Sequence, residues 1–137
     1  MDSMRLTDFL FEHLEDYATS KRAIFKSIQY ATKEISGLGG YIFTAEEDGD
    51  FMGALIINKT GMGDFMAENH LVFIAVKKEF RNQGIGKKLL GTALQYCSGN
   101  ISLHGKPDSR ALNLFKSFGF KSEYLEMRFE NLKEKTC

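Results

Sequence analysis

The residues of this chain best placed for chemistry lie between Arg81 and Lys87. They read Arg-Asn-Gln-Gly-Ile-Gly-Lys and follow an apolar run, residues 70–76. Apolar residues recur at helical spacing from Ile85, so a helix begins inside this segment. Backbone N–H groups at a helix N-terminus attract phosphate oxygens, and glycines let a ligand approach the main chain. The two flanking cations can add charge-assisted hydrogen bonds. We therefore expect a phosphate-binding turn here.

Two familiar phosphate-binding motifs do not fit this turn. A P-loop requires Gly-x-x-x-x-Gly-Lys-Ser/Thr, but Arg81 stands at the first glycine and Lys88 replaces the hydroxyl residue. The dinucleotide fingerprint requires a third glycine where the chain has Leu89. The turn therefore does not predict binding of a nucleoside triphosphate or a dinucleotide.

A second block, from Asp108 to Phe120, reads Asp-Ser-Arg-Ala-Leu-Asn-Leu-Phe-Lys-Ser-Phe-Gly-Phe. Together with Arg-x-x-Gly-x-Gly, it resembles the GNAT superfamily of N-acetyltransferases. That family carries Arg or Gln, two residues, Gly, one residue and Gly or Ala, followed by Asn-x-x-Ala-x-x-Leu-Tyr-x-x-x-Gly-Phe. The second block is in register with this pattern at every spacing. The resemblance is clear from His70 to Phe120 and less specific over residues 1–69.

The resemblance implies one domain over residues 1–137 with a three-layer α+β (α/β) fold. Its central sheet would be mixed and mostly antiparallel, with one parallel, splayed strand pair, flanked by helices. Periodicity and turn signals agree with this order of elements. The chain predicts helices near 7–17, 24–35, 85–97 and 109–118, and strands near 41–45, 51–57, 70–76, 101–104 and 120–129.

The resemblance also implies acetyl-CoA as co-substrate, held in the opening between the splayed strands. The end of the central strand would bind the pantetheine arm, the glycine turn the pyrophosphate, and the second block would complete the site. The implied cofactor contacts are Ile74, Ala75, Val76, Arg81, Asn82, Gln83, Gly84, Ile85, Gly86, Lys87, Asp108, Ala111, Leu112 and Phe115.

Catalysis in the family proceeds by direct attack of the acceptor amine on the thioester. A main-chain N–H near Ala75 or Val76 would stabilise the oxyanion. His70 stands at the start of the central strand, where relatives often carry a base, and an imidazole accepts protons at neutral pH. With simple alternation, Val72 and Ile74 would share its face. His104 is a weaker alternative as the base.

The usual thiolate-protonating tyrosine of the family is Phe115 in this chain, which has no proton to give. Tyr124 is the nearest candidate acid in sequence. We expect an acetyl-CoA-dependent N-acetyltransferase acting on an amine of a small molecule or peptide. Phe115 favours the alternative, a catalytically weak acyl-CoA-binding regulatory module. A third interpretation is an α+β protein without a CoA site.

The composition limits the classes of partner that we expect the protein to bind. Eighteen basic residues balance eighteen acidic ones, so we expect neither nucleic acid nor a membrane surface as a partner. The longest apolar run is about six residues, far below the ~20 of a membrane helix, so we expect no membrane helix. We also expect no secretory leader. Acids at Glu12, Glu15 and Asp16 would favour a cationic amine, or they are simply solvated.

The two cysteines and three histidines have no metal-ligand spacing, so we expect no metal site. Cys97 lies on an apolar helix stripe, which is typical of a core residue. Unpaired cysteines favour a reduced, cytoplasmic protein. Nothing in the sequence distinguishes a monomer from a homodimer.

Overall fold

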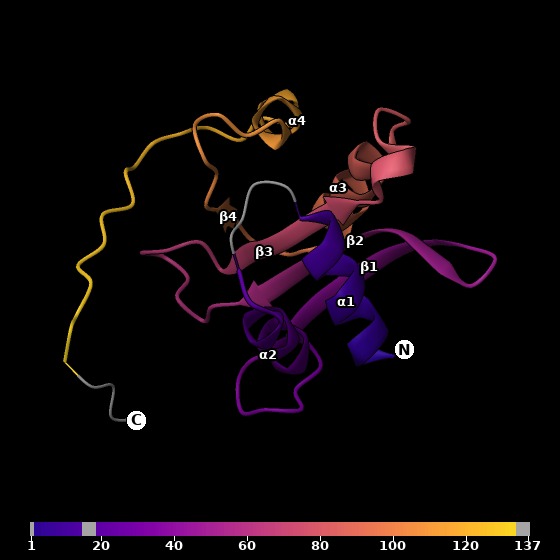
Figure 1. The fold of residues 1–137 in the computed structure, drawn as a ribbon. Helices are drawn as coiled ribbons and strands as arrows, with labels where there is room; N and C mark the ends of the chain where they lie inside the picture. Colours follow the sequence, from indigo (N-terminus) through magenta and orange to yellow (C-terminus); the bar gives the residue numbers. More distant parts are fainter. Residues whose placement is uncertain (1, 15–18, 134–137) are drawn as a thin grey trace.

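The computed structural model describes residues 2–14 and 19–133. A four-stranded sheet with helices on both of its faces forms the body of the protein (Figure 1). The elements are α1 (Ser3–His13), α2 (Lys21–Ala31), β1 (Gly40–Glu47), β2 (Asp50–Lys59), β3 (Asn69–Val76), the 3-10 turn η1 (Lys78–Phe80), α3 (Ile85–Tyr96), β4 (Ile101–Leu103) and α4 (Ala111–Ser117). None of these helices is long and apolar enough to cross a membrane.

The sheet has the order β1-β2-β3-β4. The first two pairs are antiparallel, and β3 and β4 are parallel. Pairing between β3 and β4 ends at Leu71 and Leu103, whereas β3 continues to Val76. The structure thus confirms the expected mixed, mostly antiparallel sheet with one parallel pair.

Two apolar clusters attach the helices to the sheet. Leu6 and Leu10 of α1 and Ile24 and Ile28 of α2 are fully buried against one face. On the other face, α3 and α4 pack through a second cluster. Its buried members are Leu55, Ile57, Leu71, Leu89, Leu90, Ala93 and Phe115. Burial of each large aliphatic side chain contributes about 1.5–3 kcal/mol, so these stripes fix the helices that frame the site.

The first helix begins earlier than expected. Asp2 Oδ1 accepts hydrogen bonds from Met4 N–H at 3.0 Å and Arg5 N–H at 3.2 Å, which caps α1 at Ser3. Thr7, the first residue of the expected helix, lies inside α1, and its hydroxyl donates to the Ser3 carbonyl. The second helix ends at Ala31, before the expected Ile35, because Lys33 takes a left-handed conformation with φ of 63°.

The strand expected over residues 120–129 is not formed. This segment leaves α4 and runs clear of the sheet (Figure 1). It keeps an alternation of apolar and charged residues, but β4 offers an edge of only three residues for pairing. Most of its large apolar side chains are consequently exposed, namely Tyr124, Leu125, Met127 and Phe129, as is Leu132 just beyond it.

Candidate active site

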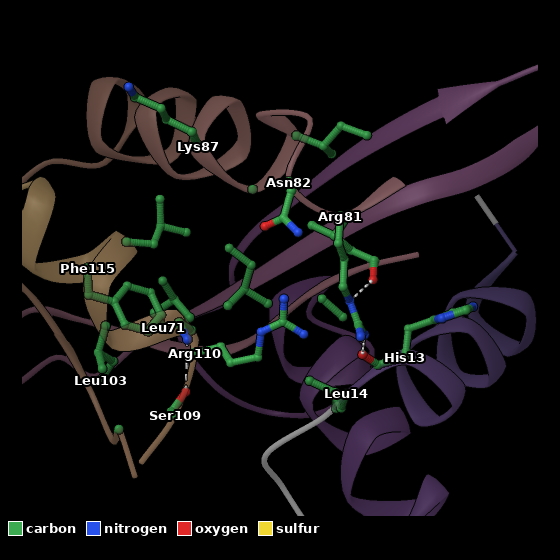
Figure 2. Close-up of a pocket in the computed structure, with 18 of the residues that line it drawn as sticks. His13, Leu14, Leu71, Arg81, Asn82, Lys87, Leu103, Ser109, Arg110 and Phe115 are labelled. Atoms are coloured by element: carbon green, nitrogen blue, oxygen red, sulfur yellow. Dashed lines mark hydrogen bonds between the residues drawn. The ribbon is translucent and has the colours of Figure 1, made fainter. Parts of the chain in front are cut away.

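A cavity of about 310 Å³ lies between the end of β3, the turn before α3, and α4 (Figure 2). The C-terminal end of α1 completes its wall through His13 and Leu14. Most of the predicted cofactor contacts line this cavity. The members of the predicted set that do not line it are Gln83, Asp108 and Leu112.

One edge of β3 is open toward the cavity. Ile74, Ala75 and Val76 pair with β2 on one side, but among the described strands none pairs with them on the other. Lys77 N–H donates to the Met52 carbonyl of β2 at 2.8 Å. Because backbone groups alternate along a strand, the N–H groups of Ile74 and Val76 point the other way, to the open side. An extended ligand could pair with this edge as an added strand.

A β-bulge interrupts β3 at Val72. The register with β2 passes from Ile56–Phe73 to Ile57–Leu71, which leaves Val72 without a counterpart. Leu71 and Ile74 therefore pack with the α3–α4 cluster, and Phe73 and Ala75 with the α1–α2 cluster. The simple alternation expected from the sequence is wrong here, because the bulge inserts one residue into the pleat.

The glycine turn opens α3 at the cavity. Gly84 has a φ of 84° and forms the N-cap of α3, with no side-chain cap and no acidic residue in the first turn. The first N–H groups of a helix have no intrahelical acceptor, so they are available to an anion. A Cβ at Gly86 would lie 3.5 Å from side-chain atoms of Leu114 and Val76, which is ordinary van der Waals contact, so the start of α3 packs close to both of these cavity walls.

The cations of the site are arranged differently from the expectation. Arg81 donates from Nε to the Val76 carbonyl at 3.2 Å and from a terminal nitrogen to the His13 carbonyl at 2.8 Å. Lys87 is exposed and projects from the outer side of α3, whereas Arg110 extends toward the centre of the cavity (Figure 2). Arg110 is not among the contacts expected from the sequence, although it directly precedes Ala111 of the second motif.

The open strand edge, the uncapped glycine turn and the second motif thus meet at one cavity. The sequence model of the Acetyltransferase (GNAT) family matches residues 6–120, which is most of the chain. The chain belongs to the GNAT acetyltransferase family. None of the curated proteins matches it significantly in sequence.

Solved structures share the GNAT fold with this chain at low identity. An aminoglycoside acetyltransferase from an uncultured soil metagenomic sample, in complex with sisomicin, is 19% identical, with a TM-score of 0.63 over 96% of this chain and 86% of that one. A ribosomal-protein-alanine N-acetyltransferase from Brucella melitensis is 14% identical, with a TM-score of 0.68 over 95% and 94%. A transcriptional regulator from Bacillus halodurans is 17% identical, with a TM-score of 0.68 over 95% and 93%. These likenesses concern the fold alone.

His70 of this GNAT chain lies at the base of the parallel strand pair and does not line the cavity. Its Nδ1 lies 2.9 Å from Ser102 Oγ, and its ring is edge-on to His104 at 4.7 Å between centroids. Burial, and secondarily the charge of His104, lower the pKa of His70. The imidazole is therefore neutral at neutral pH, which is the form a base requires.

The His70 group faces the α1–α2 side of the sheet. Ile101 and Leu103 pack in the α3–α4 cluster, so Ser102 between them points to the opposite face, and His70 with it. Val72, two residues further along β3, lines the cavity and packs against the α1–α2 cluster. His70 thus lies about one strand repeat along β3 from Val72, roughly 7 Å between backbone positions.

Of the two aromatic positions considered for protonation of the leaving thiolate, only one lies at the cavity. Phe115 is buried in the cavity wall near Leu71 and Leu103 (Figure 2), edge-on to Phe120 at 5.7 Å. Tyr124 is 88% exposed on the C-terminal segment and does not line the cavity. The structure therefore brings the tyrosine-equivalent position to the site, but not the nearest tyrosine.

Two further expectations concern Cys97 and metal binding. Cys97 is half-buried against the α3–α4 cluster, and burial raises the pKa of its thiol, so it is a poor nucleophile. Within residues 2–14 and 19–133, no group of three or more His, Cys, Asp or Glu residues is arranged to hold a metal ion.

Proposed function

We propose that this GNAT protein binds acetyl-CoA in the cavity and transfers its acetyl group directly to an amine. The observation that carries the proposal is the open edge of β3 running into the uncapped start of α3 at one cavity. The pantetheine amides would pair with Val76 as an added strand. The pyrophosphate would lie on the N–H groups after Gly84, with Arg110 as the nearest cation extending inward.

In the proposed reaction, the amine nitrogen attacks the thioester carbonyl carbon. The oxygen takes up negative charge, and the N–H of Ile74 on the open side of β3 donates to it. Such preorganised donors are typically worth 10²–10³ in rate, roughly. Collapse of the intermediate breaks the C–S bond and leaves an amide and the CoA thiolate. Acetyl never forms a bond to the protein, so Cys97 has no step to perform.

His70 would take the amine proton. Because His70 does not line the cavity, the proton would pass through one or two waters near Val72. The thiolate cannot take a proton from Phe115, and it would take one from water at the cavity mouth. This arrangement predicts working catalysis with slow thiolate protonation.

The acceptor would be an amine of a small molecule or peptide without several positive charges. The described residues that line the cavity include Arg81, Lys87 and Arg110 but neither Asp nor Glu, so a polycation would meet no compensating carboxylate there. Glu12 is 73% exposed, and Glu15 and Asp16, on which the cationic preference rested, lie outside the described residues. We further propose a cytoplasmic protein, consistent with the free Cys97 thiol.

A second candidate is a regulatory module that senses acyl-CoA without turnover. Phe115 in the cavity wall favours it. Calorimetry with acetyl-CoA, followed by a thiol-release assay with a panel of monoamines, polyamines and peptides, separates the two. Binding with amine-stimulated thiol release is the result expected for the transferase. Binding without release would establish the module, and no binding would contradict both.

A further inference from the structure

His13 joins helix α1 to the segment that leads into the glycine turn through two separate atoms. Its imidazole Nδ1 accepts a hydrogen bond from Lys78 N–H at 3.3 Å, and its carbonyl accepts one from Arg81 at 2.8 Å. The side chain is 7% exposed and its ring lies 4.8 Å from that of Phe9. Both bonds end on the segment that enters the glycine turn.

The position of His13 in its helix explains this arrangement. It is the last residue of α1, where carbonyl groups lack intrahelical donors and the helix dipole is negative. The Arg81 guanidinium satisfies that carbonyl and also donates to the Val76 carbonyl at the end of β3. One cation thus ties together the strand edge, the turn and α1.

The Nδ1 contact depends on the protonation state of His13. Nδ1 accepts from a backbone N–H, so the neutral ring carries its hydrogen on Nε2, which lies 3.6 Å from Glu12 Oε2. A protonated imidazole has no lone pair and cannot accept from Lys78. Its charge would also be repelled by Arg81, Lys78 and Lys77, with Glu12 the attracting group. Burial and these cations lower the pKa of His13.

We propose that His13 is a positioning residue whose neutral imidazole holds the Lys78–Arg81 segment in the shape that binds acetyl-CoA, so that proton uptake by His13 weakens cofactor binding. The inference rests on the proposed function, because it assumes that acetyl-CoA occupies the glycine turn. Coupling between two binding events is reciprocal. Acetyl-CoA must therefore make His13 harder to protonate by the same factor by which protonation weakens acetyl-CoA binding.

The test uses the full chain and the variant His13→Asn, whose Oδ1 can accept from Lys78 N–H but does not titrate. Acetyl-CoA affinity is measured by calorimetry at pH 7.5 and pH 5.5. Titration of the phosphates of acetyl-CoA affects both proteins equally, so it cancels when their changes in affinity are compared. We expect the wild type to lose at least about twofold more affinity than the variant on acidification, because the lowered pKa of His13 lets only part of the coupling appear at pH 5.5. His104→Asn, which removes a histidine that does not line the cavity, serves as the control. Its acetyl-CoA affinity should depend on pH as that of the wild type does.

Equal pH dependence in wild type and His13→Asn would overturn the inference. If the variant does not fold, NMR titration of the wild-type histidines replaces it: the His13 pKa should fall when acetyl-CoA is saturating, and an unchanged value would overturn the inference. Failure of the wild type to bind acetyl-CoA at pH 7.5 would instead contradict the proposed function itself. The two failures are therefore distinguishable.

Discussion

The Arg81 guanidinium donates to the His13 carbonyl at 2.8 Å, and this bond joins the end of α1 to the turn before α3. The first position of the glycine motif thus shapes the site by binding protein carbonyls. The turn is a preorganised structure held from two sides, by the Val76 carbonyl within β3 and by α1.

Replacing Arg81 by glutamine should therefore affect stability as well as binding. Glutamine can serve one of the two carbonyls but not both, and hydrogen bonds to a charged group contribute about 1.5–3 kcal/mol each. We expect the free energy of unfolding in urea to fall by about 1–2 kcal/mol and acetyl-CoA affinity to weaken. Lys88→Gln, at an exposed position of α3, is the matched loss of charge and should leave both quantities unchanged. Equal behaviour of the two variants would show that Arg81 does not brace the turn.

Replacing His70 by glutamine should separate catalysis from cofactor binding. The amide can still bond Ser102 but cannot take a proton, so kcat should fall by at least about tenfold, since a general base is worth ~10²–10⁴, with acetyl-CoA affinity nearly unchanged. Wild-type turnover in this variant would reduce His70 to a structural residue.

The pH dependence of His70 has a definite sign. The folded state lowers the pKa of its imidazole below the ordinary value of about 6.5, so the base form persists below that pH. The acidic limb of the wild-type rate profile should lie below pH 6.5, roughly. The stability that comes from the neutral His70 imidazole is complete above the pKa of the unfolded state. It is lost as the pH falls through the lower pKa of the folded state. His104→Asn removes a repelling charge and should move the limb upward; a limb that does not move would contradict the coupling.

Phe115→Tyr should restore an acid at the cavity wall. Phe115 lines the cavity and is buried, so a hydroxyl on its ring would enter the space of the thioester. We expect kcat to rise severalfold while the fold and acetyl-CoA affinity are retained. Phe120→Tyr adds the same hydroxyl to the neighbouring ring, which does not line the cavity, and should leave kcat unchanged. An equal response of the two variants would place the thiolate elsewhere.

Local sequence patterns predicted the elements well wherever one face had to be buried. Leu10, Ile24 and Ile28 lie in helices expected from the sequence and are core in the structure. The run 70–76 forms most of β3, which pairs with a strand on each side. The glycine turn and the second motif were found because their spacing is local. Their meeting at one cavity is a consequence of the parallel pairing of β3 and β4.

Features that depend on distant partners could not be predicted in this way. The bulge at Val72 is set by the register of β3 against β2, which no local period encodes. The segment at residues 120–129 has strand periodicity but no sufficient edge to pair with. His13 lies in the interior of the helix expected over residues 7–17, and only the folded chain places it at the end of α1, beside Lys78 and Arg81.

Gly84 offers the most direct test of the central claim, that acetyl-CoA binds at the turn before α3. A valine there would place its side chain over the helix N-terminus, but it would also strain a backbone with φ of 84°. Gly49, in the turn between β1 and β2, has the same φ, and a Cβ there would likewise meet nothing within 4 Å. Gly49→Val therefore carries the same strain away from the cavity.

The decisive measurement is the acetyl-CoA affinity of Gly84→Val and Gly49→Val, determined by calorimetry on both folded proteins at pH 7.5. If the cofactor's pyrophosphate lies on the N–H groups after Gly84, Gly84→Val should lose at least about tenfold in affinity, which corresponds to about 1.4 kcal/mol, and Gly49→Val should bind like the wild type. Wild-type affinity in a folded Gly84→Val protein would contradict the assignment of this cavity as the acetyl-CoA site.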